Sequence, residues 1–123
     1  MPHRLLLVDD SPTARSFAAA ALEAEGDIEV IEARSGFEAI KLLPAGQFDC
    51  IVTDINMPDI NGLEVIRFAR THTRYLQTPV IIISTEGRDR DIEKARALGA
   101  DEYVVKPFTP EELVAAVRRH LDG

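Results

Sequence analysis

The feature that most constrains the fold is a fivefold alternation of short apolar runs with segments of helical periodicity. The runs are Arg4–Val8, Ile28–Glu32, Phe48–Thr53, Val80–Ser84 and Tyr103–Val105. Three of them contain the continuous apolar stretches "LLLV", "CIV" and "VIII", which are typical of strands buried on both faces. Strands that alternate with helices form parallel sheets with helices on both sides. The sequence therefore predicts an α/β fold, a doubly wound five-stranded parallel sheet with five helices.

The segments between the runs carry start and stop signals for helices. Ser11 is a candidate N-cap with Pro12 at the first helical position, and Gly26 ends that helix. The second helix is expected over about residues 36–43 and to end at Pro44. The other three are expected to begin at Gly62, near Asp89 and after a cap at Thr109. The buried face predicted for the first helix consists of Ala14, Phe17, Ala18, Ala21 and Leu22.

Length and charge limit the kinds of protein that this sequence can be. A chain of 123 residues suits one domain, so we expect residues 1–123 to form a single domain with no output domain. No apolar run reaches the length of a membrane span, so we expect no membrane partner. The net charge of −7 argues against nucleic acid as a partner, because phosphates would be repelled. The single Cys50 excludes an internal disulfide and fits a cytoplasmic protein, and its apolar neighbours favour a buried thiol.

Polar residues follow four of the five predicted strands. The first strand is followed by Asp9 and Asp10, the third by Asp54, the fourth ends in Ser84 and the fifth is followed by Lys106. In open parallel sheets, binding sites lie outside the carboxyl ends of the strands, near a point where the strand order reverses. We therefore expect these side chains to meet. The second strand has no similar residue after it, which an edge position explains.

Three converging carboxylates repel one another unless a cation lies among them. Mg²⁺ prefers oxygen ligands and is commonly held by one or two carboxylates together with a phosphate. A cation, a carboxylate, a lysine and a hydroxyl are also the groups that phosphoryl transfer requires. The sequence therefore predicts a magnesium site at which Asp54 is the nucleophile, Lys106 neutralises the transferring oxygens and Ser84 donates to one of them.

Each of these residues, taken alone, has a purely structural interpretation. Asp10 can cap a helix, Asp54 can start an Asx-turn, Ser84 can be a strand-end hydroxyl and Lys106 can be a solvated lysine. Their joint occurrence at four strand ends favours the functional interpretation.

These residues resemble the receiver domain of two-component response regulators over essentially the whole chain. The motifs are "LLLVDDS", "IVTDINMPDINGLEV", "VIIIST" and "YVVKPF", in order. The resemblance is strongest to stand-alone, CheY-like receivers. It implies a flavodoxin-like sheet with strand order 2-1-3-4-5.

The resemblance also implies a role for each motif residue. Asp54 is the expected phosphoacceptor. Asp10 and Asp54 are expected to bind Mg²⁺ directly and Asp9 mainly through water, while Asn56 contributes its backbone carbonyl. Lys106 is expected to pair with the phosphoryl group, or with the carboxylates in its absence, and the Lys106–Pro107 bond to be cis.

The family's switch pairs a hydroxyl residue with an aromatic one, here Ser84 and Tyr103. Its output face consists of the fourth helix, the fifth strand and the fifth helix. Six basic residues lie in or near these helices: Arg88, Arg90, Lys94, Arg96, Arg118 and Arg119. Each alone is typical of a solvated charged face, whereas the set suggests a partner with an acidic surface. The expected phosphoryl donor is a histidine kinase of the CheA-like kind or a histidine phosphotransfer domain, which would dock beside the first helix.

Three functions fit these features. The preferred one is a phosphorylation-dependent signalling switch, in chemotaxis, that catalyses only its own phosphorylation and dephosphorylation. The second is a phosphorelay shuttle or phosphate sink without its own target. The third is a Mg²⁺-dependent phosphatase, which is disfavoured because no second acid follows two residues after Asp54 and no cap domain is present.

Overall fold

The computed structural model describes residues 2–85 and 89–121. The elements are β1 (His3–Val8), α1 (Pro12–Glu23), β2 (Ile28–Ala33), α2 (Gly36–Ala45), β3 (Cys50–Asp54), α3 (Gly62–Arg70), a 3₁₀ turn η1 (Thr73–Tyr75), β4 (Val80–Thr85), α4 (Asp89–Ala97), β5 (Glu102–Lys106) and α5 (Pro110–Leu121). The strands form one parallel sheet in the order β2-β1-β3-β4-β5. The predicted fold class and strand order are confirmed, and β2 lies at an edge of the sheet.

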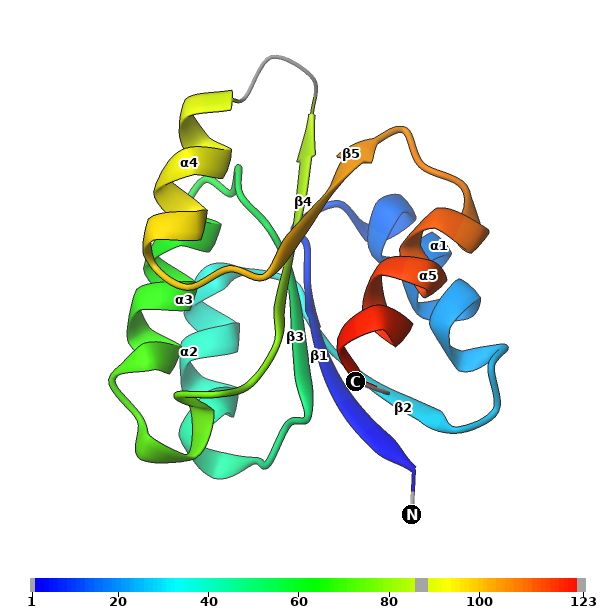
Figure 1. The fold of residues 1–123 in the computed structure, drawn as a ribbon, viewed down its shortest axis with the longest axis horizontal. Helices are drawn as coiled ribbons and strands as arrows, with labels where there is room; N and C mark the ends of the chain where they lie inside the picture. Colours follow the sequence, from blue (N-terminus) through cyan, green and yellow to red (C-terminus); the bar gives the residue numbers. More distant parts are fainter. Residues whose placement is uncertain (1, 86–88, 122–123) are drawn as a thin grey trace.

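The sheet lies between two layers of helices. Figure 1 shows α2, α3 and α4 on one face, with α1 and α5 on the other. This arrangement places the carboxyl ends of all five strands at one edge. The connections from β1 and β3 leave that edge toward opposite faces, which makes the gap between these two strands the topological switch point.

The side chains of each strand alternate between two apolar cores. Leu6 and Val8 of β1 pack beneath α2 and α3, whereas Leu5 and Leu7 pack beneath α1 and α5. All four are fully buried. Burial on both faces is the reason that the strand sequences are continuously apolar, and it confirms the prediction made from them.

The predicted helix caps are present at both ends of the chain. The Ser11 hydroxyl accepts a hydrogen bond from the Ala14 N–H at the start of α1. Thr109 and Glu112 form a reciprocal capping box before α5, in which each side chain accepts from the other residue's backbone N–H. No helix among the described residues combines the length and the apolar character needed to cross a bilayer.

Three expectations from the sequence need correction. Asp54 is the last residue of β3 rather than the residue after it. Helix α2 continues past Pro44 to Ala45, because a proline in the last turn interrupts the helix less than one in its interior. Phe17 is 46% exposed, and the buried residues of α1 are Ala18, Ala19 and Leu22. The small alanines bring α1 close to the sheet, which leaves Phe17 at the margin of the interface.

Cys50 is fully buried in β3, as expected. Burial raises the pKa of its thiol to about 12, so the thiol stays protonated and unreactive at neutral pH.

Gly62 allows α3 to begin directly against the end of β3. A Cβ atom at this position would lie 2.2 Å from the backbone oxygen of Asp54. Because backbone cannot move aside cheaply, we expect Gly62→Ala to lower the free energy of unfolding by about 2 kcal/mol in urea denaturation.

The matched control for this substitution is Gly46→Ala. There the added Cβ would meet the tip of the Phe48 ring at 2.8 Å, and a side chain can turn away. Gly46→Ala should therefore cost less stability than Gly62→Ala. Equal losses would contradict the interpretation that the Asp54 carbonyl causes the clash.

Candidate functional site

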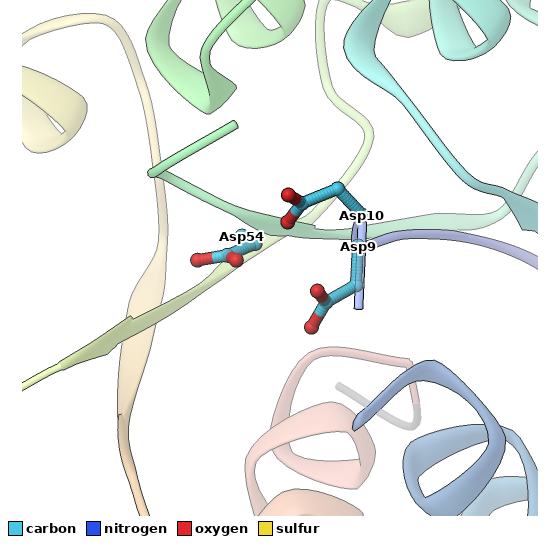
Figure 2. Close-up of side chains that lie close together, drawn as sticks. All are labelled: Asp9, Asp10 and Asp54. Atoms are coloured by element: carbon cyan, nitrogen blue, oxygen red, sulfur yellow. The ribbon is translucent and has the colours of Figure 1, made fainter. Parts of the chain in front are cut away.

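Three carboxylates gather at the switch point of the sheet. Asp9 and Asp10 directly follow β1, Asp54 ends β3, and these two strands are paired, with Val8 opposite Thr53. Figure 2 shows the three side chains around one small region. Carboxylate oxygens from all three lie within 4.8 Å of one another. The predicted convergence of these residues is therefore present.

Lys106 reaches this cluster from the end of β5. Its Nζ donates to Asp9 Oδ2 at 3.1 Å and to Asp54 Oδ2 at 3.3 Å. Burial by itself would lower the pKa of Lys106, but the charge of Asp54 and the bonds to both carboxylates outweigh it and raise that pKa. Lys106 is therefore a protonated partner of two carboxylates, and its peptide bond to Pro107 is cis, as the resemblance implies.

Asp9 is held by contacts from several elements. Its Oδ1 accepts from the Ser11 N–H at 2.9 Å, and its backbone N–H donates to the Ala33 carbonyl at 3.2 Å. Its backbone carbonyl accepts from Arg15 at 2.8 Å. Asp9 is buried, whereas Asp10 is exposed. The cluster therefore has a fixed buried side at Asp9 and an open side at Asp10.

Asp54 lies in an environment that disfavours its charge. It is 7% exposed, and this burial raises the pKa of its carboxyl above the ordinary 3.8. Lys106 acts in the opposite direction, Asp9 raises the pKa further, and the Asn56 backbone N–H lowers it by a hydrogen bond. The net result is a raised pKa, as expected for a desolvated carboxylate beside a like charge.

A raised pKa in the folded state gives stability a definite pH dependence. The folded protein binds the Asp54 proton more tightly than the unfolded chain does, so this contribution to stability is lost as pH rises through the folded-state pKa. In buffer without divalent cations, the stability of Asp54→Asn relative to the native chain should increase as pH rises from about 3 to about 7. Urea denaturation at several pH values measures this difference.

Asp59 provides a control, because its pKa is shifted in the opposite direction to that of Asp54. Its carboxylate accepts from the Phe37 N–H at 3.0 Å, and bonds from the backbone N–H groups of Phe37 and Ile60 lower its pKa below 3.8. Asp59→Asn should therefore lose stability relative to the native chain over the same rise in pH. The same pH trend in both variants would contradict the two pKa directions.

The cluster fits a divalent cation by donor type and by charge. Carboxylate oxygens are the hard ligands that Mg²⁺ prefers. Three carboxylates face the single ammonium of Lys106, which leaves two negative charges for a cation to balance. Asn56 is exposed and follows Asp54 by two residues, and the metal-binding role of its carbonyl stays a prediction.

The predicted switch residues lie on neighbouring strands and on the same face of the sheet. Tyr103 of β5 is paired with Ile82 of β4, and Ser84 is two residues further along β4. Ser84 is buried, and its hydroxyl donates to the Thr85 carbonyl at 3.1 Å. Tyr103 is exposed, with the Arg96 guanidinium 5.1 Å from the centre of its ring. The register therefore places the two residues on adjacent strands, and their coupled movement stays a prediction.

Several basic residues of the expected output face have partners within the chain. Arg118 forms ion pairs with Glu25 and Asp27, and Arg119 pairs with Glu102. Arg88 and the residues before it, 86–87, lie outside the described residues. Arg118 and Arg119 therefore already neutralise nearby carboxylates. Arg90, Lys94 and Arg96 lie on α4, and an acidic target for them stays a prediction.

An apolar groove of about 580 Å³ adjoins the site beside Lys106. Its lining residues are Ser11, Thr13, Ala14, Phe17, Thr85, Lys106, Pro107 and Phe108. The rings of Phe17 and Phe108 lie 5.9 Å apart. Phe17 thus contributes to a surface beside the carboxylates rather than to the core.

Arg15 is a site residue that the sequence reasoning missed. A signal was available, since a basic residue early in a helix opposes the helix dipole and needs a compensating contact. The first turn of α1 contains no acidic residue to provide that contact. The compensating carboxylate is that of Glu32, and Arg15 also donates to the Asp9 carbonyl. Only the folded chain brings these groups near.

Comparisons with known proteins agree with this geometry. The model of the response regulator receiver domain matches residues 5–118. A chemotaxis protein CheY homolog of Campylobacter jejuni is 40% identical over 111 residues, which cover 89% of this chain and 85% of that protein. The crystal structure of Vibrio cholerae chemotaxis protein CheY4 is 34% identical, with a TM-score of 0.92 over 98% of this chain and all of that one.

A more distant structure shares the fold. The receiver domain of sensor histidine kinase PA1611 from Pseudomonas aeruginosa, solved with a magnesium ion coordinated in its active site cleft, is 24% identical. Its TM-score is 0.90, and both chains are covered completely. Together with the match over residues 5–118, the fold and the acidic cluster lead to one conclusion: this chain belongs to the response regulator receiver domain family.

Proposed function

We propose that this receiver domain is a phosphorylation-dependent signalling switch that accepts a phosphoryl group on Asp54. The observation that carries the proposal is the contact of one ammonium group, Lys106 Nζ, with both Asp9 and Asp54 at the edge of a three-carboxylate cluster. The same ammonium that balances two carboxylates can neutralise phosphoryl oxygens as they arrive.

Asp54, Lys106 and Ser84 each have a separate role in the proposed phosphoryl transfer. A carboxylate oxygen of Asp54 forms a bond to phosphorus as the bond between phosphorus and the donor's histidine nitrogen breaks, and the imidazole leaves with a proton from solvent. Burial makes the Asp54 carboxylate more basic, and Lys106 favours its ionised form. Lys106 and the Ser84 hydroxyl then donate to oxygens of the transferred group.

Asp10, Asp54 and the Asn56 carbonyl would hold Mg²⁺ directly, with Asp9 as an outer partner. The bound Mg²⁺ supplies positive charge that offsets the negative charge of the carboxylates and the phosphoryl oxygens. The magnesium ion in the active site cleft of the Pseudomonas receiver domain supports this choice of metal.

The signal would leave through Ser84 and Tyr103. A phosphoryl oxygen on Asp54 offers the Ser84 hydroxyl a charged acceptor in place of the Thr85 carbonyl. If Ser84 turns toward it, space opens on that face of the sheet for the Tyr103 ring, which is now exposed. The change would alter the surface formed by α4, β5 and α5, where a protein target binds.

The proposed donor is a histidine kinase of the CheA-like kind or a histidine phosphotransfer domain. The apolar groove with Phe17 and Phe108 lies next to Lys106 and suits the docking of such a domain. The similarity to chemotaxis proteins of the CheY kind supports a role in chemotaxis. A phosphorelay shuttle or phosphate sink is the alternative, and transfer from Asp54 back to a histidine domain distinguishes it.

Mass measurement of the intact protein tests the proposal. The native chain, incubated with Mg²⁺ and a small acyl-phosphate donor, should gain one phosphoryl group, and hydroxylamine should remove it because acyl phosphates react with this nucleophile. A chain that binds Mg²⁺ but gains no group would contradict the proposal. Steady turnover of an unrelated phosphate ester would instead favour a phosphatase.

A further inference from the structure

Arg15 links the first helix to the main chain that carries two of the carboxylates. Its side chain is only 15% exposed. Its Nη1 donates to the backbone oxygen of Asp9 at 2.8 Å, and its Nε donates to Glu32 Oε1 at 3.0 Å. One planar guanidinium therefore connects α1, the end of β1 and the edge strand β2.

The accepting oxygen belongs to the peptide group that joins Asp9 to Asp10. This peptide lies past Val8, the last residue of β1, and past the bond from the Asp9 N–H to the Ala33 carbonyl of β2. Because a peptide group is planar, a bond to its oxygen restricts where the next Cα atom lies. Arg15 therefore helps to set the position of Asp10, the exposed member of the carboxylate cluster, without touching its side chain.

Glu32 sets the orientation of the Arg15 guanidinium group. Glu32 is paired with Leu7 in the β1–β2 register, so it projects from β2 close to the end of β1. Its carboxylate also balances the positive charge of Arg15 near the cluster. A lysine has a single ammonium and lacks the fork that lets Arg15 bond both partners.

We propose that Arg15 is a positioning residue for the cation site, which it supports by holding the Asp9–Asp10 peptide against the first helix. The inference rests on the proposed function, because it assumes that Asp10 binds Mg²⁺. Outer partners of metal ligands commonly change metal affinity by a factor of about 10 to 100 when they are removed.

A purely electrostatic role of Arg15 predicts that its removal would change the Mg²⁺ affinity in the opposite direction. If Arg15 acted only as a positive charge near the cluster, its removal would strengthen cation binding, because repulsion would be lost. If it positions Asp10, its removal weakens cation binding. The sign of the change in Mg²⁺ affinity therefore distinguishes the two roles.

The experiment is a calorimetric titration of the full chain with Mg²⁺ alone, without a phosphoryl donor. Arg15→Met should weaken binding roughly tenfold, and Arg15→Lys should fall between the native chain and Arg15→Met. Arg34→Met is the matched control, since Arg34 and Arg15 both line one surface hollow together with Glu32 and Glu38. Arg34 is 76% exposed and pairs only with Glu38 among the described ion pairs. Its affinity should stay within about twofold of the native value.

The titration distinguishes failure of the metal site from failure of the positioning role of Arg15. If the native chain binds no Mg²⁺, the metal site of the proposed function is wrong and the role of Arg15 fails with it. If the native chain binds Mg²⁺ and both Arg15 variants bind it equally well or more tightly, only the positioning role is wrong. Arg118→Met, which breaks ion pairs to Glu25 and Asp27 away from the cluster, should leave Mg²⁺ affinity unchanged and so controls for a general loss of stability.

Discussion

Asp54→Asn is expected to gain no phosphoryl group from a small acyl-phosphate donor under conditions in which the native chain gains one. The amide is nearly the same size as the carboxylate, and its oxygen can still accept a hydrogen bond from Lys106, so the site should keep its shape. An amide oxygen is a poor nucleophile, however, and forms no stable bond to a phosphoryl group. The loss is therefore expected to be complete, and intact-protein mass is the measurement.

Asp49→Asn is the matched control for this loss. Asp49 precedes β3, at the opposite end of the strand from Asp54, and its carboxylate accepts from the Arg4 N–H. This variant should be phosphorylated like the native chain. A full adduct on Asp54→Asn would move the acceptor to another residue and refute the role of Asp54.

Lys106→Met is expected to slow phosphorylation roughly a hundredfold at saturating Mg²⁺, the usual effect of removing one donor to a developing charge. Methionine keeps most of the length of the side chain but cannot neutralise phosphoryl oxygens. The rate of mass increase in the presence of the acyl-phosphate donor measures this effect. Lys94→Met removes a positive charge from exposed α4 and should leave the rate unchanged.

The same substitution should also change stability. Without the ammonium, Asp9 and Asp54 lose their shared partner while they stay buried. Removal of one member of a fully buried pair costs about 3–5 kcal/mol. The Lys106 side chain is 23% exposed, and solvent weakens its ion pairs. We therefore expect the free energy of unfolding to fall by about 2 kcal/mol. Adding Asp54→Asn to Lys106→Met should recover part of it, and strictly additive losses in urea denaturation would contradict the coupling.

The predictions that the structure confirms rest on patterns with a local physical cause. Continuous apolar runs predicted buried parallel strands, because a strand covered on both faces has no position for a polar residue. Ser11 and Thr109 predicted helix starts, because their hydroxyls satisfy N–H groups that the helix leaves unpaired. Asp9, Asp10 and Asp54 could be grouped in advance, because parallel strands end at a common edge.

The errors and omissions arise where distant segments decide the outcome. Helical periodicity placed Phe17 on the apolar face of α1, but the helix packs through its alanines and Phe17 faces a groove with Phe108. The spacing of Arg15 in the chain says nothing about the Asp9 carbonyl or about Glu32, which is 17 residues away. No local pattern contains these contacts.

The sequence therefore determined the sheet, its helices and the identity of the clustered acids, since each follows from burial or hydrogen bonding within one element. Only the tertiary structure decided which arginines pair with which carboxylates: Arg118 lies 91 residues from Asp27 and 93 from Glu25, yet it bonds both. The reason is physical. Charge balance depends on distances of a few ångströms between side chains, and packing of the helices against the sheet sets those distances.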